Sequence, residues 1–316
     1  MEHAVLFLVG FAILLKGSGV LITGASSLAQ QLRLSTWFIG IVIVGIGTSI
    51  PELSISFASA FNGVTIGLGT IIGSNTFNIF AILGIAALLS PLALQRSWVL
   101  RDLPVNIAAI LLAAIALYLP ILGDPAFTGI SRPEGIALLA SFLVWMTYLG
   151  TRKRADTASD PDIRIVAIPI AIGMVVFGIL GVIFGGRWVV EGGEALARAA
   201  GASEAFIGLT VIGIGTSLPE LIVSVRAALR RNAAIAVGNI VGSNVFDFLG
   251  IFGLTAAVRP IPVEPGLAFD ILITALSACA LFAAMFVGKR YVLGRLQGFG
   301  LLSAYLAYFL FLLVRG

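Results

Sequence analysis

The sequence contains few charged residues, one cysteine and one histidine. The single cysteine, Cys279, excludes an internal disulfide and a cysteine metal cage, and we expect it to be a small apolar packing residue. His3 stands at the N-terminus, so no imidazole is available for a buried zinc or copper site. Only 11% of residues are charged and 59% are hydrophobic, with a mean hydropathy of +1.10. These values exceed those of soluble domains and predict an integral membrane protein.

Long apolar runs predict an all-α membrane protein. The runs last about twenty residues, whereas the strands of a membrane barrel alternate apolar and polar residues over about ten. The N-terminal MEHAV lacks the basic segment of a secretory signal, so we expect the first run to be retained as a span. The runs predict ten transmembrane helices, at about residues 4–30, 37–60, 66–92, 99–120, 132–150, 165–197, 205–229, 233–258, 266–288 and 297–315.

The positive charges predict an orientation for these spans. Thirteen Lys and Arg residues fall in loops that share one side of the membrane, and four fall on the other side. By the positive-inside rule the thirteen face the cytoplasm, which places both termini outside a cell membrane. The pI of about 9.6 therefore indicates orientation, and we expect no nucleic-acid partner.

Two motifs occur twice along the chain. GIVIVGIGTSIPEL at Gly40–Leu53 returns as GLTVIGIGTSLPEL at Gly208–Leu221, 168 residues later. IGSNTFN at Ile72–Asn78 returns as VGSNVFD at Val241–Asp247, 169 residues later. We therefore predict a first five-helix repeat over residues 1–150, a cytoplasmic connecting loop over 151–164 and a second five-helix repeat over 165–316. Because five crossings are an odd number, the second repeat is inverted, as in many secondary transporters with midplane sites.

Each copy of the first motif places oxygen ligands on one helix face. Thr48 and Ser49 precede Glu52 by four and three residues, so the three side chains share a face. Pro51 should kink the helix and leave backbone carbonyls free. The second copy, and the span that follows each copy, add further oxygen-bearing side chains: Thr216, Ser217, Glu220, Ser74, Asn78, Ser243 and Asp247.

Buried acids at these positions predict a cation site. An ionised carboxylate near the bilayer centre costs several kcal/mol, so Glu52, Glu220 and Asp247 require a compensating cation. Ligands that are all oxygen suit a hard cation, either one doubly charged ion or several singly charged ions. The alternative keeps the glutamates protonated or pairs them with Lys16 or Arg187, the two basic residues within spans.

Four neighbouring residues have expected structural roles. Asn75 and Asn244 point about 100° away from the repeated serines on a helix, so we expect them to brace neighbouring spans. Gly73 and Gly242 are expected to allow close approach where helices cross.

The paired motifs resemble the two signature repeats of the sodium/calcium exchangers, within the cation/calcium exchanger superfamily, and the resemblance covers the whole ten-span plan. It implies transported calcium and sodium ions, no cofactor, and sliding of the first and sixth spans against the other helices. Some family members carry alanine at the positions of the two motif glycines, a difference expected to matter little for a carbonyl ligand. The ion ligands that the resemblance implies are the side chains of Thr48, Ser49, Glu52, Ser74, Asn78, Thr216, Ser217, Glu220, Ser243 and Asp247 and the backbone carbonyls of Gly45 and Gly213.

The expected function is sodium/calcium antiport, in which sodium entry drives calcium export by alternating access to one shared site. Proton/calcium antiport on the same fold is the alternative, because crowded carboxylates can take up protons. The resemblance favours sodium, since proton-coupled relatives tend to carry additional carboxylate in place of the GTS hydroxyls. A channel and a hydrolase are less favoured, the hydrolase because no buried His or Cys accompanies the serines. We expect a monomer in membrane lipid that catalyses no reaction.

Overall fold

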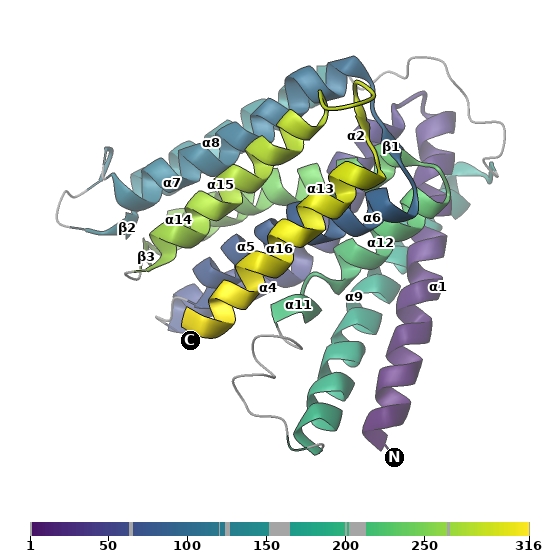
Figure 1. Cartoon of the computed structure of the whole chain (residues 1–316), viewed down its shortest axis with the longest axis horizontal. Helices are drawn as coiled ribbons and strands as arrows, with labels where there is room; N and C mark the ends of the chain where they lie inside the picture. The colour runs from purple at the N-terminus through teal and green to yellow at the C-terminus, as the bar shows by residue number, and fades with distance from the viewer. Residues whose placement is uncertain are drawn as a thin grey trace.

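The computed structural model describes residues 2–62, 66–119, 121–123, 127–151, 165–199, 201, 213–263 and 266–315 of the 316-residue chain. Helices dominate these residues, and Figure 1 shows their arrangement. The α-helices are α1 (Glu2–Gln31), α2 (Thr36–Ile39), α3 (Ile46–Thr48), α4 (Ile50–Asn62), α5 (Ile66–Phe77), α6 (Leu83–Leu89), α7 (Leu103–Tyr118), α8 (Arg132–Thr151), α9 (Ile168–Ala199), α11 (Gly213–Gly215), α12 (Leu218–Leu229), α13 (Ala233–Val245), α14 (Phe252–Val258), α15 (Leu267–Ala284) and α16 (Arg295–Arg315). The π-helical segments are η1 (Gly40–Gly45), η2 (Asn78–Ile82), η3 (Trp98–Asp102) and η5 (Phe246–Ile251).

The membrane-spanning helices match the predicted runs. Among the described residues, eight continuous helices are long and apolar enough to cross a membrane, or up to nine if the bent pair Thr36–Thr48 and Ile50–Phe61 forms one span. The span predicted over 205–229 lies partly outside the described residues, and its described part is α11 and α12. The predicted loop 151–164 is described only at Thr151. The count of ten spans and the inversion of the halves therefore stay predictions.

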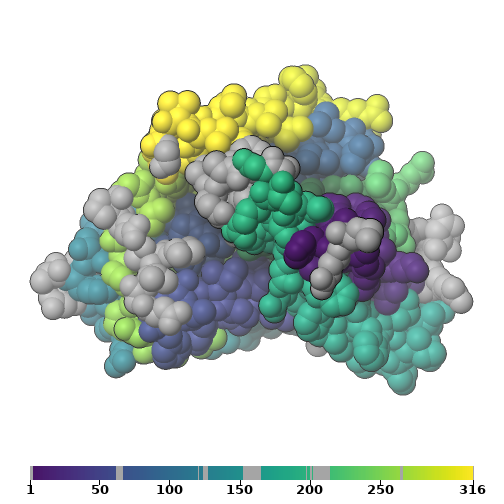
Figure 2. All heavy atoms as spheres, turned by 90° about the horizontal axis from the view of Figure 1, so that it is seen from below, coloured from purple at the N-terminus to yellow at the C-terminus, as the bar shows by residue number. Residues whose placement is uncertain are grey.

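The helices α1 and α9 lie against each other over most of their length (Figures 1 and 2). Their glycines recur every seven residues at the contact, for example at Gly10 and Gly17 on α1. A Cβ added at Gly10 would lie 2.7 Å from Trp188 Cβ, and one added at Gly185 would lie 2.5 Å from the Leu14 nitrogen. Since larger side chains would force the backbones apart, these glycines join α1 and α9 into one tightly packed pair.

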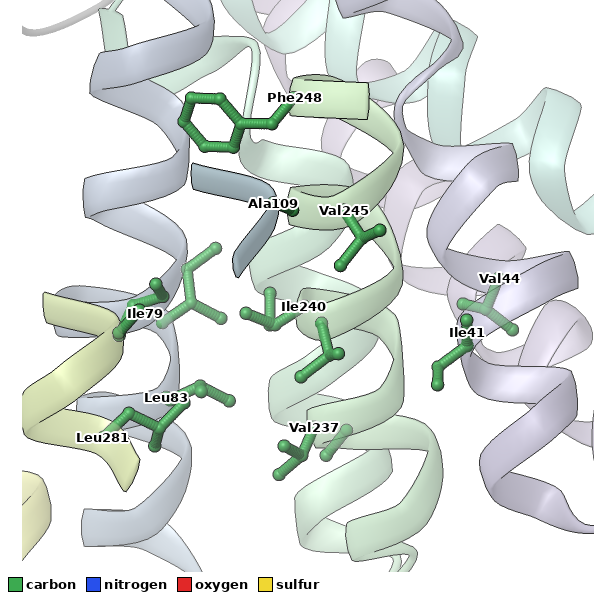
Figure 3. Close-up of a cluster of buried hydrophobic side chains, with 14 of the residues drawn as sticks. Ile41, Val44, Ile79, Leu83, Ala109, Val237, Ile240, Val245, Phe248 and Leu281 are labelled. Atoms are coloured by element: carbon green, nitrogen blue, oxygen red, sulfur yellow. The ribbon is translucent and has the colours of Figure 1, made fainter. Parts of the chain in front are cut away.

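The continuous helix formed by α13, η5 and α14 lies at the centre of the protein. It is the most deeply buried of the continuous spans in the described residues, because 94% of its most apolar stretch of 18 residues lies inside the protein. Figure 3 shows Ile41 and Val44 of η1 on one side of α13, and Ile79 and Leu83 on the other. Apolar side chains from both halves therefore fix α13 between η1 and the helix that contains η2.

Two short antiparallel ladders make the fold slightly less than all-helical. Strand β1 (Leu92–Ala93) pairs with β4 (Val292–Leu293), and β2 (Gly129–Ile130) pairs with β3 (Ile261–Pro262). Each ladder joins a loop of the first half to a loop of the second half. A second difference is that Cys279 is exposed on α15, so its expected packing role is wrong.

Candidate cation site

The helix that carries the first motif breaks where the sequence predicts a kink. The two parts, Thr36–Thr48 and Ile50–Phe61, are bent by 44°. Ser49 at the break has φ −84° and ψ 9°, and Ser217 in the second copy has φ −91° and ψ 8°. This conformation is sparsely populated and is often found at active sites. Because Pro51 and Pro219 have no N–H to donate, both copies interrupt their helix in the same way.

The second motif lies where the α-helix widens to a π-helix. Segment η2 begins at Asn78, and η5 contains Asp247 as its second residue. π-helical turns inside α-helices often mark functional sites. The widened turns therefore place the amide of the first half and the carboxylate of the second half in similar local settings.

Most predicted ligands are deeply buried. The exposed fraction of each of these side chains does not exceed 4%. None of them therefore faces lipid or solvent. The buried set comprises Thr48, Ser49, Glu52, Ser74, Asn78, Ser217, Glu220, Ser243 and Asp247. Thr216 is half-buried, and Gly213 is described only in its backbone.

The two halves meet at Gly45. Its carbonyl oxygen accepts a hydrogen bond from Ser243 Oγ at 3.1 Å and lies 3.2 Å from Thr48 Oγ1. Thr48 Oγ1 and Ser243 Oγ are 3.5 Å apart. A Cβ added at Gly45 would lie 2.8 Å from the Asn239 carbonyl oxygen, because η1 and α13 are in backbone contact here. Three predicted oxygen ligands from both halves are therefore adjacent.

The second motifs of the two halves also bond to each other. Asn75 Nδ2 donates to Asp247 Oδ2 at 2.8 Å, and Asn78 Nδ2 donates to Asn244 Oδ1 at 3.2 Å. These bonds confirm the bracing role expected for Asn75 and Asn244. They also show that Asn75 orients a predicted ligand.

The three acids of the predicted site, Glu52, Glu220 and Asp247, form no salt bridge within the described residues. The neighbours whose charges act on Glu52 are themselves acids, Glu220 and Asp247, so the interaction is repulsive. Arg187 instead pairs with Glu191 on the surface of α9, with an N–O distance of 2.6 Å, and Lys16 is exposed. The pairing of the glutamates with these two basic residues is therefore wrong. No three His, Cys, Asp or Glu side chains in the described residues are close enough to hold one metal ion.

The site contains oxygens that lack hydrogen-bond partners. Across the described residues, 14 buried side-chain nitrogen and oxygen atoms have no partner, and eight of them belong to predicted ligands. Buried polar atoms are normally hydrogen-bonded, so these oxygens are unusual in having their lone pairs available to a ligand. The eight atoms are Ser49 Oγ, Glu52 Oε2, Asn78 Oδ1, Thr216 Oγ1, Ser217 Oγ, Glu220 Oε1, Glu220 Oε2 and Asp247 Oδ1.

Some predicted residues are less firmly placed. The hydroxyl of Ser74 donates to the carbonyl of Ile71 in its own helix, at 3.0 Å. A Cβ at Gly242 would lie 2.3 Å from the Ile41 oxygen, which confirms close approach there. A Cβ at Gly73 would meet nothing within 4 Å among the described residues, and the contact that matches Gly242–Ile41 falls within 202–212, so the role expected for Gly73 stays a prediction. The segment 202–212, which the repeat aligns with 34–44, lies outside the described residues.

The motif analysis did not identify Asn239. Its Oδ1 lies 3.1 Å from Thr48 Oγ1, and its Nδ2 lies 2.9 Å from Ser224 Oγ. The available signal was its position one helical turn before Ser243, on the same face.

A helical membrane protein with buried acids and unpaired oxygens contributed by two similar halves has the features of a secondary transporter. Residues 2–151 and 170–314 match the model of the sodium/calcium exchanger protein family. The chain belongs to that family.

Individual relatives agree with this assignment. The chain is 31% identical to the inner membrane protein YrbG of Escherichia coli strain K12, over 82% of this chain and 81% of that protein. It is 29% identical to the sodium/calcium exchanger MaX1 of Methanosarcina acetivorans, over 96% of each protein. A crystal form of the sodium-calcium exchanger NCX_Mj, soaked with Na⁺ and Ca²⁺, matches with a TM-score of 0.82 at 27% identity, over 97% of each chain.

Proposed function

We propose that this protein is a sodium/calcium antiporter, which exports calcium in exchange for sodium. Two relatives, one in sequence and one in structure, carry the name sodium/calcium exchanger. The alignments cover 96% or more of each chain, the fold matches that of NCX_Mj with a TM-score of 0.82, and both copies of the GTS-x-PE motif are intact. Transport of this kind forms no covalent bond, so we propose that the protein is not an enzyme.

The proposed ligands are the motif oxygens of both halves. Glu52, Glu220 and Asp247 supply negative charge, and the hydroxyls of Thr48, Ser49, Ser74, Thr216, Ser217 and Ser243, the amide of Asn78 and the carbonyls of Gly45 and Gly213 complete the set. Carboxylate, hydroxyl and carbonyl oxygens bind Ca²⁺ in a flexible geometry. Sodium has a similar radius, so a flexible oxygen cage can accept either ion, and the total charge limits how many ions bind at once.

One observation carries the proposal: of the 14 buried polar side-chain atoms that have no partner in the described residues, eight belong to these ligands. A carboxylate buried without a counter-charge is strongly unfavourable. Glu220 has two such oxygens, both buried and both without a hydrogen bond in the described residues. A bound cation would satisfy these oxygens from both halves together, whereas no hydrogen bond in the described part of the chain does so.

The same arrangement suggests how access alternates. We propose two inverted repeats, over 1–150 and 165–316, joined by a cytoplasmic loop over 151–164, with both termini outside a cell membrane. The glycine-packed pair of α1 and α9 would move as a unit against the remaining helices. The inversion would allow the two arrangements of this pair to expose the site to opposite sides. A monomer contains all the proposed ligands.

Sodium coupling is tested by calcium uptake into proteoliposomes at clamped pH. An imposed outward sodium gradient should drive ⁴⁵Ca²⁺ uptake, and equal sodium on both sides should not. Uptake that needs only a pH gradient would instead establish the proton/calcium alternative. Unitary current steps in a planar bilayer would indicate a channel and refute both forms of antiport.

A further inference from the structure

The side chain of Asn239 connects the two halves of the proposed site without being one of its ligands. It is fully buried on α13, one helical turn before Ser243. Its Nδ2 faces α12, where it donates to Ser224 Oγ at 2.9 Å and to the carbonyl oxygen of Glu220 at 3.4 Å. Its Oδ1 faces η1 and α3, at 3.1 Å from Thr48 Oγ1.

These contacts determine which way the amide points. The carbonyl oxygen of Glu220 can only accept a hydrogen bond, so the atom that faces it must be the amide nitrogen. The atom that faces Thr48 is therefore the amide oxygen, which can only accept. It follows that the Thr48 hydroxyl is the donor in this contact.

The direction of that bond matters because Thr48 has one proton and several possible acceptors besides Asn239. They are the carbonyl oxygen of Gly45 at 3.2 Å, Ser243 Oγ at 3.5 Å and the carboxylate of Glu220, which Thr48 also approaches. The Gly45 carbonyl already accepts from Ser243 Oγ at 3.1 Å and from the Ser49 nitrogen at 3.3 Å. If Thr48 also donated to Gly45, the proton would lie between two proposed cation ligands.

We propose that Asn239 is a positioning residue that orients the Thr48 hydroxyl for cation binding. By accepting the hydrogen bond that Thr48 donates, Asn239 turns the hydroxyl lone pairs away from itself and leaves the Gly45 carbonyl with one donor fewer. Both oxygens then present electron density to the ion. This inference rests on the proposed function, because it assumes that Thr48 and Gly45 bind a cation.

The repeat places a different residue at the matching position of the first half. With the offset of 169 residues, Asn239 corresponds to Thr70. A threonine hydroxyl cannot combine a separate acceptor with two donors as an amide does. Thr216, which corresponds to Thr48, has no hydrogen-bond partner for its hydroxyl among the described residues. The two threonine ligands are therefore not equivalent, and Thr48 is the one held in a fixed orientation.

A double-mutant cycle between Asn239 and Thr48 tests the inference. Asn239→Leu keeps a similar volume and removes the acceptor, and Thr48→Val removes the hydroxyl. The apparent Ca²⁺ and Na⁺ affinities of purified protein are measured by ion-dependent thermal stabilisation. We expect Asn239→Leu to weaken the affinity about threefold to tenfold, the loss of one buried hydrogen bond. In the Thr48→Val background the same substitution should have no further effect, because the hydroxyl that it orients is gone.

Two further variants keep the test decisive. Asn239→Thr, which copies the residue at position 70, should weaken ion binding as Asn239→Leu does and serves if the leucine variant does not fold. Asn106→Leu, a buried asparagine on α7 outside the site, should leave ion affinity unchanged. Affinity losses that multiply in the double variant, or wild-type affinity in both Asn239 variants, would overturn the positioning role. A wild-type protein that neither ion stabilises would instead overturn the proposed function.

Discussion

Asn75 of the first half donates its amide N–H to Asp247 of the second half, across a distance of 2.8 Å. Both residues are fully buried, with exposed fractions of 0% and 1%. A hydrogen bond to an ionised carboxylate is roughly twice as strong as one between neutral groups. The contact therefore fixes the orientation of Asp247 and leaves its second oxygen, Oδ1, without a partner in the described residues.

The first prediction concerns Asp247→Asn. The substitution retains the shape of the side chain and makes the position match Asn78, but it removes one negative charge from the site. We expect calcium uptake to continue with a lower calcium affinity or an altered sodium dependence, because Glu52 and Glu220 remain. Uptake of ⁴⁵Ca²⁺ into proteoliposomes at varied sodium and calcium measures both quantities. Unchanged values for both would show that Asp247 has no role in ion binding.

The second prediction concerns the two glutamates. Glu52→Gln and Glu220→Gln should each abolish calcium transport, because shape is kept and charge is lost. Neither glutamate forms a salt bridge within the described residues, so the ion-free protein should be at least as stable as the wild type. Thermal unfolding with and without calcium measures this, and near-normal transport in either variant would refute the site.

A matched control for the glutamates is available at Glu134. This buried acid accepts hydrogen bonds from the Ser131 nitrogen at 2.9 Å, the Ser131 hydroxyl at 2.7 Å and the Ile121 nitrogen at 3.0 Å. Glu134→Gln weakens these bonds at the start of α8, so it should lower stability by about 1 kcal/mol. It should leave the response to calcium unchanged. Variants of Glu52 and Glu220 should lose the response to calcium but not stability, and the Glu134 variant should lose stability but not the response to calcium. This difference distinguishes glutamates that bind ions from a glutamate that supports the fold.

Parts of this site could be predicted from the sequence, and others depend on tertiary contacts. The break at Ser49 follows from Pro51, and the burial of Glu52 follows from the repeated motif. The contact of Asn75 with Asp247 could not be predicted, because it depends on how α5 and η5 pack. The π-helical turn at Asn78 was not expected either, since no local sequence rule distinguishes it from an α-helical turn. The role of Asn239 depends on three helices meeting at one side chain.

The third prediction corrects an expectation about Gly45. Alanine was expected to matter little there, because the ligand is a carbonyl oxygen. In the structure a Cβ at Gly45 would lie 2.8 Å from the Asn239 oxygen and 2.9 Å from the Ser243 nitrogen, both backbone atoms. We therefore expect Gly45→Ala to separate η1 from α13, lowering stability by about 1–3 kcal/mol and weakening calcium binding. Gly300→Ala on the exposed face of α16, with nothing within 4 Å in the described residues, is the control and should be nearly neutral. Equal behaviour of the two variants would contradict the close contact at Gly45.

The last prediction concerns the attachment of α1 to α12. Arg226 donates to the Leu15 carbonyl and to Ser18 Oγ, the latter at 3.3 Å. Arg230 donates to the Gly19 carbonyl at 3.3 Å and to Thr23 Oγ1 at 3.0 Å. The segment 54–62, which the repeat aligns with this part of α12, contains no Lys or Arg. The two arginines therefore attach α1, and with it the α1–α9 pair, to α12 of the second half, and segment 54–62 has no basic residue that could form an equivalent attachment.

Replacing both arginines by glutamine should loosen this attachment. Glutamine is too short to reach the carbonyls of Leu15 and Gly19, and it has no positive charge to strengthen such a hydrogen bond. Spin labels at Val20 on α1 and Leu229 on α12, both exposed, report the separation in a Cys279→Ser background. We expect a longer and broader distance distribution in the double variant, since the pair of α1 and α9 is then free to sample a second position. Arg231→Gln alters the exposed neighbouring arginine and should leave the distribution unchanged. Identical distributions in all three proteins would mean that apolar packing alone holds α1 to α12.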